Sequence, residues 1–466
     1  MNIRSIVFVF ILLLTSSSSY AEQKLASREP RYCLSLNNGL LPSANSTVGL
    51  DKLSFELYRT TLYPIDLINQ HFYSDNRIAT TLGTLGYGLL HSWFIMLPIS
   101  IAYHEFGHAR GLLALDSDSD PTYYDDLPNY NRSHNPFTSI TSGKTYYHIL
   151  GSFLKGKQAG FVLPKIATEL VNSYYTTYNK EKVTAEAQQI IDSPTIDQIS
   201  VWAGGMNNQA IFASTIEDHA TLKNEYYLFD ILALASNKLI PEIYLESDIP
   251  NDLKSTLLFN NDHLALMHLM NDHGSIKRHY RIKNIIPDYT AEMSKTGCFL
   301  SFFLSGSTYQ GFYNIYNYVS TGQLYTPTFN YKGFYLPNTS FFFTSQGLSL
   351  RFKAAYQWDP NLLIMATYES VYKGHTVHEF KISAFKTIPQ LANLQIHAAI
   401  LMSSGIHERI AAQGNVGVKI PLGNNFNIET AYYLWNKNTL DGERNIPSAE
   451  DGDFDHEVMI GISAEF

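Results

Sequence analysis

The chain has 466 residues, which is enough for two or three domains with a substantial core. Its net charge of −9 and the lack of a basic run exclude the electrostatic surface that nucleic-acid-binding proteins need. Charged residues make up only 16% of the chain and aromatic residues 14%, a bias typical of proteins that contact membrane lipid.

The first 21 residues have the features of a secretory signal peptide. Arg4 supplies a positive charge, residues 6–14 form a short apolar core, and residues 19–21 form a small-x-small cleavage site. An uncleaved anchor is the alternative, but the apolar core is too short to span a bilayer. We therefore expect export across the inner membrane and a mature chain that begins near Glu22.

An apolar stretch, residues 78–103, leads into a His-Glu-Phe-Gly-His motif. The stretch contains no Asp, Glu, Lys or Arg, and its large apolar side chains recur with helical spacing. Three glycines and Pro98 interrupt it, which favours a helix buried in protein over a helix that spans lipid.

On a helix, His104 and His108 lie one turn apart on the same face, so both imidazoles can bind one Zn²⁺. Glu105 then lies beside the metal, where it can take a proton from a water that zinc activates and pass it to a leaving amine. The motif therefore predicts a zinc metallopeptidase. The alternative is an ordinary helix whose polar end carries two solvated histidines.

The sequence His-Glu-Phe-Gly-His-Ala-Arg resembles the site-2-protease class of membrane zinc metallopeptidases. The resemblance implies that His104 and His108 are zinc ligands and that Glu105 is the catalytic base. A second segment, Ala-Gly-Gly-Met-Asn-Asn at 203–208, is similar to the Ala-Gly-Pro-x-x-Asn segment of that class. The one Leu-Asp-Gly sequence after the motif, the type of sequence that carries the third ligand of the class, stands at 440–442, in an acidic segment of the predicted β region.

Asp230 is our first candidate for the third ligand. It lies within an apolar run, where a carboxylate needs a cation or a metal as partner. Glu225, which follows an asparagine, is an alternative. The cluster of Glu217, Asp218 and His219 is another, and a solvated helix face or cap is possible for each of these residues.

The periodicity of the chain predicts an α+β multidomain protein. Residues 22–296 should form a mainly helical peptidase-like domain, with helices at 163–178, 182–191 and 262–270. Residues 297–466 should form an antiparallel β region. Cys33 and Cys298 are the only cysteines, and in an oxidising compartment they can form one disulfide between the two parts or remain two separate thiols.

The β region has the alternation of a membrane barrel. Apolar and polar residues alternate in 348–358, 412–420, 426–434 and 458–466, and the chain stops at Phe466. This resembles the closing strand of bacterial outer-membrane β-barrels, which commonly end in Phe and have an apolar outward face. We expect about eight to ten strands of about ten residues. A soluble sandwich or barrel is the alternative.

These features together predict a zinc peptidase at the outer membrane, with the peptidase part on the periplasmic side or packed within the barrel. Zn²⁺ is the expected cofactor, a protein or peptide the expected substrate, and membrane lipid the expected partner. A zinc hydrolase of lipid or peptidoglycan amides uses the same site. The rival from another class is a non-enzymatic barrel, acting as channel, adhesin or assembly scaffold, in which the His-Glu motif is structural or inactive.

Overall fold

The computed structural model describes residues 33–37, 55–56, 58–72, 76–96, 99–100, 104, 195–246, 291–344, 347–374, 377–388, 394–404, 409–422, 426–436 and 454–465. The predicted signal peptide and the predicted helices at 163–178, 182–191 and 262–270 lie outside these residues. Among the residues described, no helix is both long enough and apolar enough to cross a membrane.

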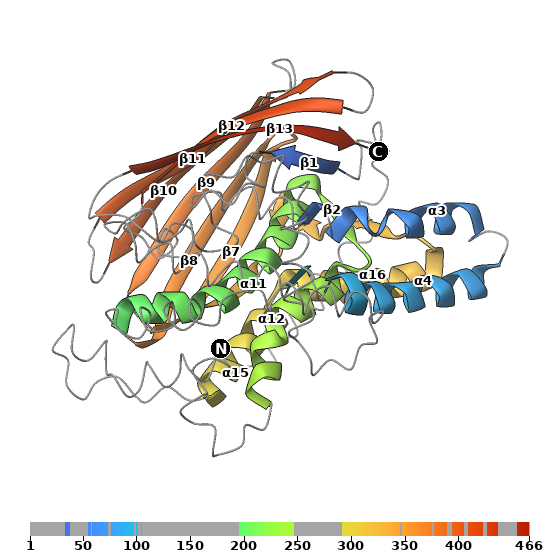
Figure 1. The fold of residues 1–466 in the computed structure, drawn as a ribbon, viewed down its shortest axis with the longest axis horizontal. Coiled ribbons are helices and arrows are strands. Elements are labelled where there is room, and N and C mark those ends of the chain that lie inside the picture. The colour runs from blue at the N-terminus through green and yellow to red at the C-terminus, as the bar shows by residue number, and fades with distance from the viewer. Residues whose placement is uncertain are drawn as a thin grey trace, which may run out of the picture.

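Helices dominate the first part of the fold and continue past residue 297 (Figure 1). They are α3 (Tyr63–Phe72), α4 (Arg77–His91), α11 (Thr195–Lys223), α12 (Asp230–Glu246), α15 (Ala291–Phe303) and α16 (Gly306–Thr321), and a short π-helix, η3 (Ser92–Met96), directly follows α4. Asn76 caps α4 by accepting a hydrogen bond from the backbone N–H of Ala79 at 3.1 Å. Helix α16 ends at Gly322, whose φ of 79° is the left-handed conformation that favours glycine at this position.

The strands form one large antiparallel sheet and a small one. The large sheet contains β1 (Cys33–Asn37), β4 (Asn330–Tyr331), β5 (Phe334–Tyr335), β6 (Asn338–Thr344), β7 (Gly347–Asp359), β8 (Leu362–Gly374), β9 (His378–Ile388), β10 (Leu394–Ser404), β11 (Arg409–Pro421), β12 (Phe426–Asn436) and β13 (Phe454–Glu465). Strands β7 to β12 each pair with the next strand in the chain, β13 also pairs with β1, and β6 pairs with β7. The small sheet pairs β2 (Glu225–Tyr227) with β3 (Tyr325–Pro327).

The predicted α+β class is confirmed, but the closure of the sheet into a barrel is not. Over the described residues the order runs from β1 and β13 to β5 and β4, and these two ends do not pair with each other. The four predicted strand segments lie in β7, β11, β12 and β13. Closure needs a register that joins the two ends, which alternation within single strands does not specify.

The predicted domain boundary between 296 and 297 falls inside helix α15. Helices continue to the end of α16, and β1, from the start of the predicted helical domain, pairs with the last strand, β13. Period-two alternation begins only with the long strands. The helical part therefore extends to about residue 322, and the two parts share one sheet.

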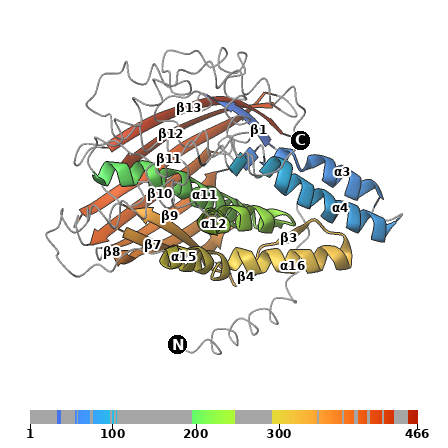
Figure 2. The ribbon, with the colours of Figure 1, turned by 60° about the horizontal axis from the view of Figure 1, so that its bottom comes forward.

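Helix α11 joins the helices to the sheet. Figure 2 shows it lying along one face of the long strands, with α12 next to it. On β7, the ammonium group of Lys353 donates hydrogen bonds to Asp218 of α11 at 2.6 Å and to Ser214 at 2.7 Å. This face of the sheet is mainly polar, so ion pairs and hydrogen bonds hold the two layers together.

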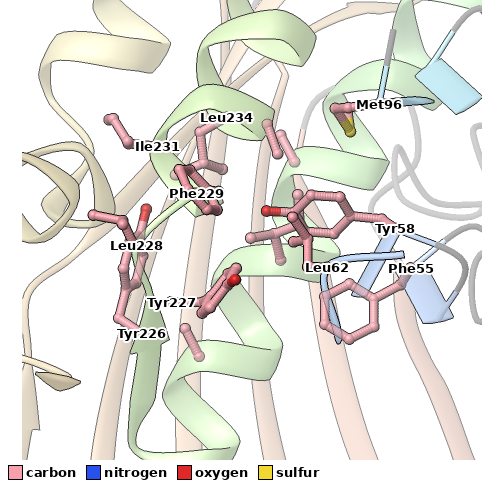
Figure 3. Close-up of a cluster of buried hydrophobic side chains, with 14 of the residues drawn as sticks. Phe55, Tyr58, Leu62, Met96, Tyr226, Tyr227, Leu228, Phe229, Ile231 and Leu234 are labelled. Atoms are coloured by element: carbon pink, nitrogen blue, oxygen red, sulfur yellow. The ribbon is translucent and has the colours of Figure 1, made fainter. Parts of the chain in front are cut away.

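The main apolar core lies among the helices and includes residues of the small sheet (Figure 3). It brings together Tyr58 and Leu62 from the segment before α3, Phe212 from α11, and the stretch Tyr226 to Phe229 that leads into α12. Each of these side chains is at most 3% exposed. Burial of such aromatic groups contributes most of the stability available to this layer.

Helix α4, which contains the first part of the apolar stretch 78–103, is only partly buried. Its side chains Ile78, Leu82, Leu89 and Leu90 are exposed, whereas one polar face packs inward. The sequence pattern marks apolar positions correctly but does not say whether they face protein or another apolar medium.

Gly88 of α4 makes a close contact that provides a test of this packing. A Cβ atom at Gly88 would lie 1.9 Å from the ring of Phe229, whereas nothing lies within 4 Å of a Cβ at Gly86. We expect Gly88→Ala to lower the free energy of unfolding by about 1–3 kcal/mol. The control Gly86→Ala should raise it by up to about 1 kcal/mol through helix propensity. Denaturant unfolding of both variants measures the difference, and equal stabilities would contradict the packing.

Candidate metal centre

His104 is the member of the His-Glu-Phe-Gly-His motif that the structure describes; Glu105 and His108 lie outside the described residues. The chain reaches it through α4, η3 and residues 99–100. His104 is 2% exposed and lies against α11. A histidine buried to this degree needs defined hydrogen-bond partners.

A chain of hydrogen bonds connects the His104 ring to the backbone of α12. Nδ1 of His104 lies 3.2 Å from Oε1 of Gln209, and Nε2 of Gln209 donates to the hydroxyl of Ser100 at 3.1 Å. Ser100 donates to Oδ1 of Asn237 at 2.7 Å, and Nδ2 of Asn237 donates to the carbonyl of Ala233 at 2.8 Å. We call these four side chains, His104, Gln209, Ser100 and Asn237, the relay.

The relay fixes the tautomer of His104. The carbonyl of Ala233 can only accept, so Asn237 uses its NH₂ there and presents its oxygen to Ser100. Ser100 therefore donates to Asn237 and accepts from the NH₂ of Gln209, which leaves the Gln209 oxygen for His104. Nδ1 of His104 carries the proton, and Nε2 carries the lone pair with which a neutral imidazole binds zinc.

Gln209 of the relay lies on helix α11. It directly follows residues 203–208, the Ala-Gly-Gly-Met-Asn-Asn segment singled out in the sequence analysis. Within that segment, Asn207 pairs with the backbone of Phe343 in β6: its NH₂ donates to the carbonyl at 2.7 Å, and its oxygen accepts from the N–H at 2.9 Å. This pair holds α11 against β6. Sequence reasoning missed Gln209, although three consecutive amides, 207–209, in a helix with apolar neighbours are the available signal.

Asp230, the predicted third ligand, is the first residue of α12 and is fully buried. Its Oδ2 accepts from Arg59 at 2.8 Å and from the backbone N–H of Tyr227 at 3.0 Å, and its Oδ1 accepts from Tyr58 at 3.1 Å. Burial raises the pKa of the Asp230 carboxyl, and Arg59 acts against that rise. The structure thus gives Asp230 the cation that its burial requires; its zinc ligation stays a prediction.

The other candidate ligands also have protein partners. Glu217 forms a buried ion pair with Lys238 at 2.6 Å, and Asp218 pairs with Lys353 at 2.6 Å. His219 packs on the ring of Phe55, and burial together with the charge of Arg59 holds the pKa of its imidazole well below the usual value. Glu225 lies half-buried in β2. Among the described residues, no three His, Cys, Asp or Glu side chains are grouped so that they could hold a metal.

Of the two cysteines that were expected to form one disulfide or remain separate, Cys298 is a buried thiol in α15. Cys33 lies on β1, which pairs with β13 at the end of the sheet. Helix α15 instead packs against β6 and β7, which belong to the other end of the strand order.

The comparisons with known proteins identify no relative: no protein-family model, curated protein or solved structure matches the chain. The functional argument therefore depends on the motif and on the geometry around His104.

The two roles of Asp230 can be separated experimentally. If Asp230 serves the ion pair, Asp230→Asn leaves Arg59 buried without its anion and should lower stability by about 3–5 kcal/mol while zinc content is unchanged. The control is Asp359→Asn, which removes the half-exposed partner of Lys386 and should change neither property. Thermal unfolding and elemental analysis provide the two readouts, and loss of zinc from Asp230→Asn alone would identify Asp230 as a ligand.

Proposed function

We propose that this protein is a zinc-dependent peptidase in which His104 and His108 bind the metal and Glu105 is the general base. The observation that supports the proposal is the hydrogen bond from Nδ1 of His104 to Gln209. Histidines that bind metals usually donate their second ring N–H to an oxygen, which fixes the ring and raises the basicity of the ligating nitrogen.

The residues fit zinc in chemical type. Neutral imidazole is a preferred zinc ligand, and in the neutral ring the relay's hydrogen bond at Nδ1 leaves Nε2 as the atom that would bind the metal. When bound, zinc supplies a Lewis acid that lowers the pKa of water and polarises an amide carbonyl.

The protein's own groups then perform two tasks. Glu105 removes a proton from the attacking water and delivers it to the nitrogen of the leaving amine, so that the carboxylate ends in its starting form. Gln209, Ser100 and Asn237 hold the His104 ring so that it need not reorient during the reaction. A protein or peptide is the proposed substrate; amides of lipid or peptidoglycan are attacked by the same chemistry.

We further propose that the long strands lie in the outer membrane as part of a barrel, after export directed by residues 1–21. One face of the sheet is apolar and exposed, and its residues face one another across the strands: Phe352 is opposite Tyr368, Ile382 opposite Ile400, and Val416 opposite Tyr432. A water-soluble sheet normally buries such a face.

The opposite face of the sheet is largely buried and carries both polar residues and a few apolar ones such as Met365 and Leu401. Glu369 is 1% exposed and accepts hydrogen bonds from Arg351 at 3.0 Å and from Ser349 at 2.5 Å. Strands β7 to β13 have 11 to 13 residues each, which is enough for the 9 to 11 residues that a tilted strand needs to cross the hydrocarbon. An apolar outside, a mainly polar inside and sufficient strand length support a membrane barrel.

The first test of the proposed function is zinc content and turnover. Purified protein should contain about one zinc per chain and lose it in the His104→Ala, His108→Ala double variant. Glu105→Gln should keep the zinc and lose hydrolysis of an unstructured protein substrate. Absence of zinc from folded, metal-reconstituted protein would contradict the peptidase and favour a barrel with a non-enzymatic task.

The relay makes a separate prediction. Gln209→Leu removes the oxygen that accepts from His104, so zinc affinity should fall by about 10–100-fold. Gln310→Leu is the matched control, because Gln310 is equally buried but bonds to Thr326 of β3. Competition with a zinc chelator measures the zinc affinity of both variants. Equal affinities would contradict a role of Gln209 in zinc binding.

A further inference from the structure

Helix α4 has the reverse of the pattern that a helix in water shows. The exposed fraction is 74% for Ile78, 66% for Leu82 and 63% for Leu89. The buried positions of the same helix are Thr80, Thr84, Gly88 and His91. A helix on the surface of a soluble protein places its apolar residues inward and its polar residues outward.

Helix α16 has the same reversed pattern. It exposes Phe312, Tyr313, Tyr316 and Val319, and apart from Tyr318 its buried residues are small or polar: Gly306, Ser307, Thr308, Gln310, Gly311 and Asn314. These buried groups bond to neighbouring elements; for example, the NH₂ of Asn314 donates to the carbonyl of Tyr226 at 2.8 Å. Contacts through small residues and side-chain hydrogen bonds are characteristic of helices that pack in lipid.

The exposed surfaces of these helices come from sequence without charge. Residues 78–103 contain no Asp, Glu, Lys or Arg, and neither do residues 296–331, which include most of α15 and all of α16. Soluble proteins place charges on about a quarter to a third of their surface positions. The chemistry of these surfaces therefore matches acyl chains, and an aqueous or charged partner does not fit it.

Both helices have a polar boundary at the same place. Arg77, at the start of α4, donates hydrogen bonds to the carbonyls of Val319 and Ser320 at the end of α16. An arginine at this position pairs with the negative end of the α16 dipole and can reach water. At 1.5 Å per residue, α4 and α16 extend about 22–24 Å from this boundary, less than the hydrocarbon thickness of about 30 Å.

We propose that the exposed faces of α4 and α16 contact the acyl chains of the bilayer, with Arg77 at the lipid–water boundary. In Figures 1 and 2 both helices extend away from the long strands, on the side of α12. The bilayer then covers apolar surface on the helices as well as on the sheet, and the relay lies within this membrane-embedded body. The inference builds on the membrane location proposed above and is independent of the zinc chemistry.

Spin-label accessibility in reconstituted protein tests the proposal. A nitroxide is attached to single cysteines at Leu82 and Tyr316 of the full chain, with Cys33 and Cys298 replaced by serine, in vesicles of phosphatidylethanolamine and phosphatidylglycerol. Ile462, on the exposed apolar face of β13, reports on the sheet, and Asn361, in the turn between β7 and β8, reports on water. Leu89 and Val319 are the substitutes if a variant does not fold.

The proposal expects Leu82 and Tyr316 to behave like Ile462: high collision rates with oxygen and low rates with a water-soluble nickel chelate, the reverse of Asn361. If Ile462 shows lipid contact while Leu82 and Tyr316 collide with nickel, the helices lie in water and the inference is wrong, although the sheet remains in the membrane. Exclusion of both reagents from Leu82 and Tyr316 would also overturn it, because protein would then cover the helices. Nickel access at Ile462 would overturn the membrane location itself.

Discussion

The packing of the helices against the sheet depends on one requirement: the buried polar side chains of helix α11 need hydrogen-bond or ion-pair partners. Helix α11 carries Asn207, Gln209, Glu217 and Asp218, which bond to Phe343 of β6, His104, Lys238 of α12 and Lys353 of β7. An unpaired buried group would cost about 1–3 kcal/mol, so these four pairs fix both the position and the rotation of α11 between the sheet and α12. The same rotation brings Gln209 to His104, and the site thus depends on the packing of the whole helical layer.

Beside the apolar core among the helices, the interior holds many polar side chains, whereas α4, α16 and the long strands expose apolar ones. Three buried ion pairs connect different elements. Arg59–Asp230 joins residues far apart in the chain, Lys238–Glu217 joins α12 to α11, and Arg351–Glu369 joins the neighbouring strands β7 and β8. Breaking one partner of such a pair costs about 3–5 kcal/mol, which makes each pair a strong determinant of the arrangement. The lipid environment proposed above would cover the exposed aromatic and aliphatic faces of α4, α16 and the long strands.

The sequence predicted what local periodicity and motif spacing can encode. The strands β7, β11, β12 and β13 follow from alternation, and the motif at His104 follows from helical spacing. Local sequence patterns did not predict that Gln209 is the partner of His104 or that Arg59 is the partner of Asp230, because the residues of these pairs are 105 and 171 positions apart. The boundary predicted at residue 296 falls inside α15, because α15 has little amphipathic periodicity from which its end could be read.

The central claim is that the relay presents His104 as a ligand of one zinc site together with His108. X-ray absorption at the zinc edge of the metal-loaded protein tests it most directly, because imidazole rings give a recognisable outer-shell signal. The account predicts two imidazoles at about 2.0–2.1 Å from the zinc, one of which disappears in His104→Ala. A spectrum without imidazole, or one that His104→Ala leaves unchanged, would contradict the account.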